Sequence, residues 1–231
     1  MKIAFAILVL SNSISFPVKA GVVDKALLSM IHYSASNQII VNLFAHQDVT
    51  PKTDKYENVK ANSLGHSYLE ITNTYQEPVF IQGFRIDYNQ SITIGLWGDT
   101  GSSDGPSVDG HVGIFVNREA YHYSKLETPD KSTMIMATVS KDKLPDLYPV
   151  CMEKAFTYDL LNYNCTIFAT ECWYLLTGQD LRCNSPYELR HKIMDVEDGV
   201  EGCYTMLETD CFYSYYRSSG RFLKYEPREE R

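Results

Sequence analysis

The pattern of hydrophobic and polar residues divides the chain into a strand-rich middle and a helical segment that follows it. From Ile39 to about residue 140, short runs rich in β-branched and aromatic residues alternate with clusters of Asn, Asp, Gly, Ser and Pro, as is typical of antiparallel strands joined by turns. The runs are IIVNLFAH, GHSYLEITN, PVFIQGFRID, SITIGLWG, HVGIFVN and STMIMATVS. They predict a mostly antiparallel sheet of five or six strands in an α+β fold.

Helices are predicted on both sides of this strand region. VDKALLSMIHYSASNQ has apolar residues at helical spacing, and KDKLPDLYPVCMEKAF predicts a helix that begins near Lys143. In NYNCTIFATECWYLLTG, Asn162 or Asn164 is a suitable N-cap and Gly178 a suitable stop. This last segment therefore predicts a helix that carries Cys165 in its first turn and is packed against the sheet.

The first residues predict export. MKIAFAILVLSNSISFPVKAG has a positive charge at Lys2, a short apolar run, and small or β-branched residues at Val18 and Ala20, the spacing that signal peptidase accepts. We expect cleavage near Ala20 and a secreted or periplasmic protein without a transmembrane segment. The expected organisation is a signal peptide, an N-terminal helical segment, a main domain and a Cys-containing C-terminal extension, at residues 1–20, 21–38, 39–179 and 180–231.

Composition excludes some classes of partner. The formal net charge is −8, and no basic stripe runs along the sequence, so nucleic acid is not an expected partner. The histidines and acids lack a metal-ligand spacing such as H-E-x-x-H, and the cysteines form no C-x-x-C pair. We therefore expect neither a metal nor another cofactor.

The six cysteines allow two different interpretations. In an exported chain they are compatible with three disulfides, but Cys165 and Cys172 are separated by seven helical positions, about 10 Å, which is too far for a disulfide. A thiol at a helix N-terminus has a lowered pKa, which favours a nucleophile at Cys165. The four cysteines outside this helix could then form two disulfides, and Cys172 would be a buried thiol. These four are Cys151, Cys183, Cys203 and Cys211.

A nucleophilic cysteine needs a base, and two histidines are suitable. His66 in LGHSYLEITN and His111 in DGHVGIFVN each follow a glycine and open a predicted strand. Glycine permits another segment to approach closely, and a strand holds the imidazole rigidly. Either histidine is therefore a candidate partner for Cys165.

GHSYLEITN, SITIGLWG, GIFVNREAY and NYNCTIFATECWYLLTG resemble the circularly permuted branch of the NlpC-type papain-like superfamily, in which the histidine strand precedes the cysteine helix. This branch includes relatives of lecithin:retinol acyltransferase and secreted bacterial proteins. The resemblance covers residues of about 39–179. Its most specific part is the pattern Asn-Cys-x-x-Phe-Ala-x-x-x-Trp, formed by Asn164, Cys165, Phe168, Ala169 and Trp173.

The resemblance implies that Cys165 is the nucleophile and His66 the base, with His111 as the alternative base. A third residue orients the imidazole in this family. Gln82 in VFIQGF is the candidate, and Glu70 is the alternative because it lies four residues along the strand on the same face as His66.

The implied function is that of a secreted cysteine hydrolase or acyltransferase. It would attack an amide or ester through a thioester on Cys165, with a cell-wall peptide or another acyl-bearing molecule as the substrate. Because folds outlast their chemistry, the alternative is a catalytically inactive secreted binding protein on the same scaffold, stabilised by disulfides.

Overall fold

The computed structural model of the 231-residue chain describes residues 37–46, 65–98, 113–123, 132–154, 158–159, 161–203, 205, 207, 209–216 and 218–225. The predicted signal peptide, the N-terminal helical segment up to residue 36 and His111 lie outside these residues.

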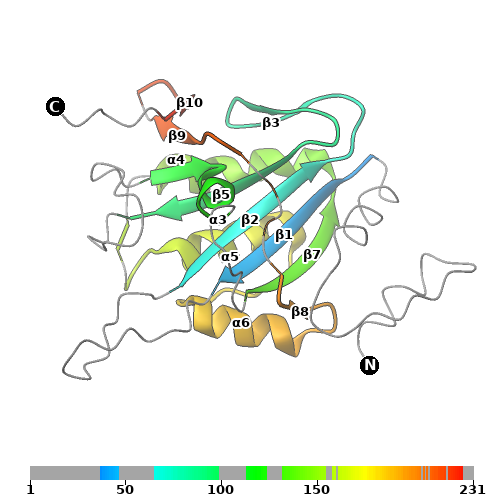
Figure 1. Cartoon of the computed structure of the whole chain (residues 1–231), viewed down its shortest axis with the longest axis vertical. Helices are drawn as coiled ribbons and strands as arrows, with labels where there is room; N and C mark the ends of the chain where they lie inside the picture. Colours follow the sequence, from blue (N-terminus) through cyan, green and yellow to red (C-terminus); the bar gives the residue numbers. More distant parts are fainter. Residues whose placement is uncertain are drawn as a thin grey trace, which may run out of the picture.

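An eight-stranded sheet forms the centre of the described structure, in the order β10-β9-β6-β5-β2-β1-β7-β8 (Figure 1). All of its neighbouring strands run antiparallel. The strands are β1 (Ile39–His46), β2 (His66–Asn73), β5 (Ser91–Trp97), β6 (Gly113–Val116), β7 (Thr133–Val139), β8 (Val200–Glu201), β9 (Tyr213–Tyr216) and β10 (Arg221–Lys224). The predicted α+β class with a mostly antiparallel sheet is confirmed.

The sheet is larger than the five or six strands expected. Five of the predicted runs form β1, β2, β5, β6 and β7, and three further strands come from the C-terminal extension. We expected short helices or irregular structure in this extension. It does contain a helix, Pro186–Asp195, but it also supplies strands: β9 pairs with β6 and extends the sheet, while β8 pairs with β7 at the opposite edge.

The remaining predicted run, PVFIQGFRID, folds into a separate hairpin. Its strands are β3 (Val79–Ile81) and β4 (Phe84–Ile86), which pair only with each other among the described strands. Gln82 and Gly83 have φ angles of +48° and +76°, as in the two-residue type I′ turn that matches the twist of a hairpin. The hairpin lies beside β10, where a Cβ on Gly83 would be 3.8 Å from the Arg221 Cβ.

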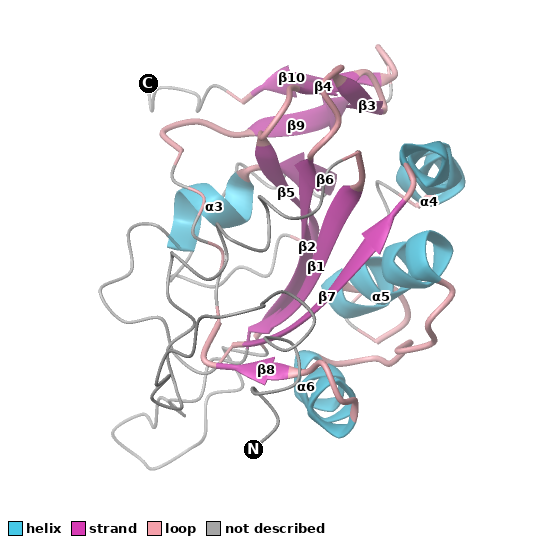
Figure 2. Ribbon diagram, turned by 90° about the vertical axis from the view of Figure 1, so that its right-hand side faces the viewer, coloured by secondary structure: helices cyan, strands magenta, loops and turns pink. Residues whose placement is uncertain are grey.

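Three helices of the described structure cover one face of the sheet (Figure 2). They are α4 (Tyr148–Glu153), α5 (Cys165–Thr177) and α6 (Pro186–Asp195), whereas α3 (Arg118–Tyr123) lies on the opposite face. Helix α5 begins and ends as predicted, with Asn164 as N-cap and Gly178 in the left-handed region at its C-terminus. The helix expected from Lys143 is instead a 3-10 helix, Lys141–Leu147, which contains Pro145 and continues into α4.

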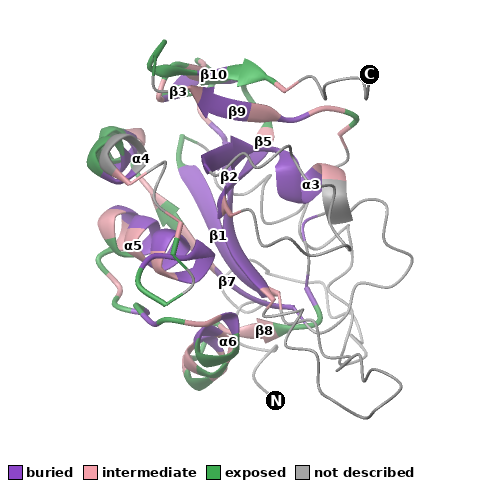
Figure 3. Ribbon diagram, turned by 90° about the vertical axis from the view of Figure 1, so that its left-hand side faces the viewer, coloured by how far each residue is buried: buried purple, intermediate pink, exposed green. Residues whose placement is uncertain are grey.

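The main core lies between the sheet and α5, and the buried surfaces face each other in Figure 3. Alternate residues of β1, β2 and β5 point into this core, including Leu43, Leu69 and Ile94, which are fully buried. Trp173 of α5 is also fully buried, and its indole N–H donates to Gln179 at 3.2 Å. Burial of these side chains fixes α5, and with it Cys165, against the sheet.

The expected disulfides receive no support from the structure. Cys183, Cys203 and Cys211 carry free thiols, and the side chain of Cys151 lies outside the described part. Cys183 follows α5, whereas Cys203 packs with Phe44 and Tyr68 on the opposite face of the sheet. The sheet thus separates two of the thiols that the sequence placed in bridges.

None of the helices in the described segments is both long enough and apolar enough to cross a membrane.

The hairpin turn predicts opposite effects for two neighbouring substitutions. Gln82→Gly should stabilise the fold by several tenths of a kcal/mol, because a side chain in the left-handed region costs about 1–2 kcal/mol, partly offset by the greater chain entropy of glycine. Gly83→Ala should destabilise the fold by about 1 kcal/mol, because it places a side chain in the left-handed region. A clash adds nothing to this cost, since the new Cβ would meet no atom closer than 3.8 Å. Urea denaturation measures both; two shifts of the same sign would contradict the turn assignment.

Candidate active site

The candidate site lies at the end of β2, where groups from the two faces of the sheet meet. Cys165 begins α5 on the core face, whereas His66 is the first residue of β2 and stacks toward Tyr68, with 5.9 Å between ring centroids, on the other face. The Cys165 sulfur interacts with His66 by a hydrogen bond and by charge. Because His66 is the first residue of β2, the thiol and the imidazole can meet beside the end of this strand.

Asn164 places Cys165 in the first turn of α5. Its extended backbone ends the preceding loop, and its side-chain oxygen accepts from the backbone N–H groups of Thr166 and Ile167 at 2.9 and 3.1 Å. Its amide group also donates to the Asn184 carbonyl at 2.9 Å. One side chain therefore caps the helix and ties it to the segment before α6.

Two further contacts join the start of α5 to β2. The hydroxyls of Ser67 and Thr166 are hydrogen bonded at 3.1 Å. The Ser67 backbone N–H also donates to the Cys165 sulfur and, like the Thr166 side chain, lowers the pKa of the thiol.

Glu119 is the group that holds the histidine. The His66 Nε2 lies 3.1 Å from the Glu119 Oε1, and Glu119 is fully buried. The Trp97 indole donates to the same carboxylate oxygen at 2.7 Å, and the Thr93 hydroxyl donates to the other at 2.9 Å. With Nε2 engaged by Glu119, Nδ1 is the nitrogen left to face the sulfur.

The turn at Asn117 brings Glu119 over the sheet. Asn117 has a φ of +65°, a conformation that asparagine tolerates better than most residues. Its backbone N–H donates to the Thr93 carbonyl, and its side-chain oxygen accepts from the Thr93 N–H, so it prolongs the pairing of β6 with β5. The chain then enters α3 directly above β5, which brings the Glu119 carboxylate to Thr93 and His66.

Gly95 provides the space in which His66 and Glu119 meet. A Cβ at this position would lie 1.9 Å from the Glu119 Oε1 and 3.2 Å from the His66 Nε2. Any side chain at position 95 would thus occupy the place of the carboxylate. The close approach of the Glu119 carboxylate, and not a turn, therefore explains a glycine in the middle of β5.

The pKa values of the three groups favour a thiolate–imidazolium pair. Burial opposes charge on His66, but the Cys165 thiolate and the Glu119 carboxylate outweigh it and raise the His66 pKa to about 9. Burial likewise opposes the Cys165 thiolate, yet the positive charge and hydrogen bond of His66 lower the thiol pKa below its ordinary value. Burial also raises the pKa of Glu119, but its bonds to His66 and Trp97 leave it lowered. The directions of these shifts favour the charged form of each group: thiolate, imidazolium and carboxylate.

Trp97 also supports the imidazole by packing. Its ring centroid is 4.3 Å from that of His66, and the Arg118 guanidinium lies 4.1 Å above the indole. Arg118 is buried, which lowers its pKa to about 10 in spite of the neighbouring Glu119. The indole thus contributes a hydrogen bond to Glu119 and a wall to His66.

The structure brings together Cys165 and His66 but places the predicted third residues elsewhere. Gln82 lies in the hairpin turn, and the hairpin is attached near Asn73, whose amide donates to the Ile86 carbonyl at 3.0 Å. Asn73 and His66 are at opposite ends of β2, seven residues or roughly 23 Å apart. The prediction of Gln82 as the imidazole partner is therefore not supported, because PVFIQGFRID turns back on itself.

Glu70 lies on the expected face of β2 but has other partners. It accepts hydrogen bonds from the Asn42 amide and the Thr205 hydroxyl, and burial raises its pKa. It is too far along the strand to orient His66.

The sequence analysis missed Glu119, although the segment GIFVNREAY was singled out. A usable signal was present in SITIGLW, where Thr93, Gly95 and Trp97 alternate with core residues and so share the face opposite α5. A carboxylate directly after the neighbouring strand was the natural partner for these side chains.

Within the described segments, no group of three or more His, Cys, Asp or Glu residues is arranged to hold a metal ion.

Comparisons with protein-family models, with curated proteins and with solved structures found no match for this chain.

The contact at Gly95 predicts that Gly95→Ala disrupts the site more than the fold. The added Cβ must displace the Glu119 carboxylate, so the His66 pKa should fall from about 9 toward its ordinary 6.5. Cys165 alkylation at pH 6.5 should then slow by about tenfold, one pKa unit of lost stabilisation of the thiolate. NMR titration of His66 and iodoacetamide labelling measure the two effects.

The matched control is Gly220→Ala, in the turn between β9 and β10, where a Cβ would meet nothing within 4 Å. It should cost stability through its φ of +63° while leaving Cys165 labelling unchanged. Equal labelling rates in the Gly95→Ala variant and the parent would contradict the arrangement of His66 and Glu119.

The charge on Glu119 predicts a specific pH dependence. The thiolate–imidazolium pair exists above the lowered pKa of Cys165 and below the His66 pKa of about 9. Glu119→Gln removes the carboxylate that stabilises the imidazolium, so the His66 pKa should fall and the Cys165 pKa should rise. The midpoint of the alkylation rate against pH should therefore move upward by about one unit. An unchanged midpoint would show that Glu119 does not support the pair.

Proposed function

We propose that this protein is a cysteine-dependent acyl-transfer enzyme, a hydrolase or an acyltransferase, in which Cys165 is the nucleophile, His66 the acid–base group and Glu119 the residue that orients the imidazole. One observation carries the proposal: His66 is hydrogen bonded to the buried Glu119 carboxylate through Nε2 while it pairs with the Cys165 thiol. A nucleophile, a base and a group that orients the base form the constellation of covalent acyl transfer.

The proposed reaction begins with the thiolate. Cys165 attacks the carbonyl carbon of an amide or ester and forms an S–C bond, while the carbonyl π electrons move to oxygen. When the tetrahedral intermediate collapses, the bond to the leaving amine or alcohol breaks and His66 gives it a proton. Water or a second acceptor, which gives its proton to His66, then attacks the thioester and releases the acyl group and the Cys165 thiolate.

The backbone N–H of Cys165 is a suitable donor to the oxyanion. The Asn164 side chain takes the N–H groups of the next two residues, and within the described residues the Cys165 N–H has no acceptor. It belongs to the first turn of a helix, where the dipole also favours negative charge.

We also propose that the domain has the circularly permuted papain-like arrangement. Along the chain, the His66 strand comes first and the Cys165 helix last, which is the order of that branch. The antiparallel sheet with α5 packed against it is in keeping with the proposal. Relative to the sequence-based expectation, Glu119 takes the place of Gln82, and His111 stays as the alternative base outside the described residues.

The substrate class follows from the proposed chemistry and from the predicted export. We propose that the enzyme acts outside the cytoplasm on an amide or ester of a cell-wall peptide or another acyl-bearing molecule. The first step needs only an accessible carbonyl and a leaving group that His66 can protonate, so a simple activated ester is a valid probe.

Incubation with p-nitrophenyl acetate tests the proposal. The expected result is an initial burst of p-nitrophenol and a gain of one acetyl group on Cys165, located by peptide mass spectrometry. Cys165→Ala should lose the adduct, and His66→Ala should form it at least 100-fold more slowly, since general base catalysis is worth about 10²–10⁴-fold. A parent protein that forms no adduct would favour a binding protein on the same scaffold.

Two further variants make the test specific. Cys172→Ala alters another buried thiol of α5, two turns from Cys165, and should acetylate at the parent rate. His111→Ala should also leave the rate unchanged. If the rate falls in His111→Ala but not in His66→Ala, the base has been assigned to the wrong strand.

A further inference from the structure

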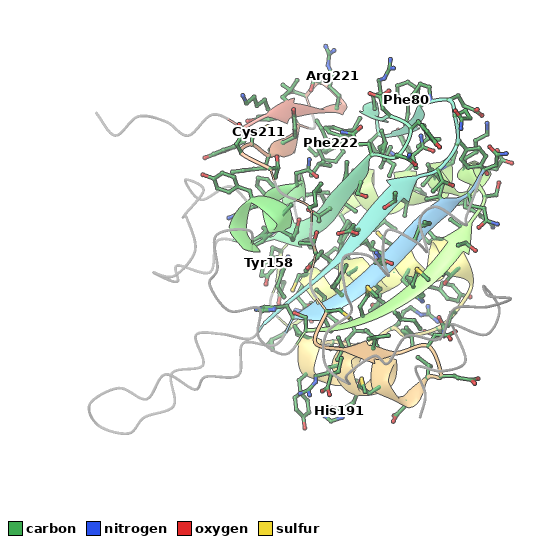
Figure 4. All side chains as sticks on the ribbon, turned by 45° about the vertical axis from the view of Figure 1, so that its right-hand side comes forward. Phe80, Tyr158, His191, Cys211, Arg221 and Phe222 are labelled. Atoms are coloured by element: carbon green, nitrogen blue, oxygen red, sulfur yellow. The ribbon has the colours of Figure 1, made fainter. Side chains whose placement is uncertain are left out.

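Tyr158 packs against the wall of the candidate site. A Cβ on Gly98 would lie 2.3–2.6 Å from three carbons of the Tyr158 ring, so the ring lies directly on the Gly98 backbone. Gly98 follows Trp97, whose indole contacts His66 and bonds Glu119. Figure 4 shows Tyr158 below α3, the helix that carries Glu119.

The turn before α5 brings the backbone at Tyr158 close to the start of α5. Asp159 and Tyr163 form an antiparallel bridge, with two backbone hydrogen bonds of 2.8 Å. The Asp159 carboxylate also accepts from the backbone N–H groups of Leu161 and Asn162. These hydrogen bonds hold the turn, which brings the residue before the bridge close to the residues that begin α5. The charge of the Cys165 thiolate contributes to the raised pKa of Tyr158.

The hydroxyl of Tyr158 has no hydrogen-bond partner in the described part of the chain, and the residue is half-buried. Burial first, and the Cys165 thiolate second, raise its pKa well above the ordinary value. At every pH at which the thiolate–imidazolium pair exists, the side chain is therefore a neutral phenol with a proton to donate.

We propose that Tyr158 is a further catalytic residue, which donates its hydroxyl hydrogen bond to the oxygen of the substrate carbonyl as Cys165 attacks. The inference rests on the proposed acyl-transfer function. Tyr158 packs on Gly98 beside the site and precedes the turn that leads into Cys165, yet its hydroxyl bonds none of the described residues. That leaves it available to a substrate oxygen located between the sulfur and the phenol.

The proposed donor acts in a balanced step. As the Cys165 sulfur bonds to the carbonyl carbon, the oxygen gains the π pair and one negative charge, which the Tyr158 O–H and the Cys165 N–H stabilise by hydrogen bonds. No proton leaves Tyr158. When the intermediate collapses, the electron pair returns to re-form C=O and the leaving group departs with a proton from His66.

Two electrophiles distinguish an oxyanion donor from a merely structural side chain. p-Nitrophenyl acetate creates an oxyanion when it acylates Cys165, whereas iodoacetamide is attacked at its methylene carbon, loses iodide and creates none. Tyr158→Phe should slow acylation by about 100-fold, the cost of one oxyanion donor. It should leave the alkylation rate within about twofold of the parent, because the thiolate itself is untouched.

The matched control is Tyr88→Phe, which removes the hydroxyl of an exposed tyrosine in the segment between β4 and β5 and should change neither rate. Equal acylation rates in Tyr158→Phe and the parent would overturn the inference, and so would an equal loss in both reactions, which indicates altered thiol reactivity. If the parent protein is not acylated at all, the proposed function fails and the inference fails with it. Acylation that requires Cys165 but not the Tyr158 hydroxyl overturns the inference alone.

Discussion

The candidate site depends on one buried ionic contact, that between the Cys165 thiolate and the His66 imidazolium. Burial disfavours each charge by itself, and charges taken out of water are retained only when they are paired and hydrogen bonded. Glu119 supplies the remaining support because it is fully buried, bonds Nε2 of His66 and accepts from Trp97 and Thr93. Removal of His66 would leave both negative charges without their partner, and removal of Glu119 would weaken the imidazolium that stabilises the thiolate, so these groups act as a unit.

The two faces of the sheet differ in polarity and in the part of the candidate site that they support. The face toward α5 is apolar and fixes the helix that carries Cys165 by close packing. The other face carries a row of buried polar groups, in which Asn42 is paired with Glu70 and Glu70 with Thr93 in the strand register. The contact between thiol and imidazole occurs at the end of β2, the place where a group from one face can reach a group from the other without crossing the hydrogen-bonded strands.

Local patterns predicted β1, β2, β5, β7 and α5 closely, because each is specified by its own periodicity and its own end signals, such as the cap at Asn164. The prediction of Gln82 as the imidazole partner is not supported, because the ten-residue run PVFIQGFRID was interpreted as one strand. Its central Gln-Gly pair forms a turn instead. Glu119 was missed because its position depends on the pairing of Asn117 with Thr93, and β9 because its partner β6 is about 100 residues away in the chain. Contacts of this kind are set by tertiary structure and leave little trace in a local pattern.

The same physics explains why one thiol is singled out. Burial raises the pKa of both Cys183 and Cys203 to about 11. Glu188 adds to the rise at Cys183 and Lys192 opposes it only in part, whereas burial alone accounts for the rise at Cys203. Cys165 is buried as well, yet its pKa is lowered because His66 supplies the opposing charge. Burial without a partner protects a thiol from reaction, and burial with an imidazolium activates it. Selectivity among the cysteines therefore arises from the position of one histidine at the end of β2, and only indirectly from exposure to solvent.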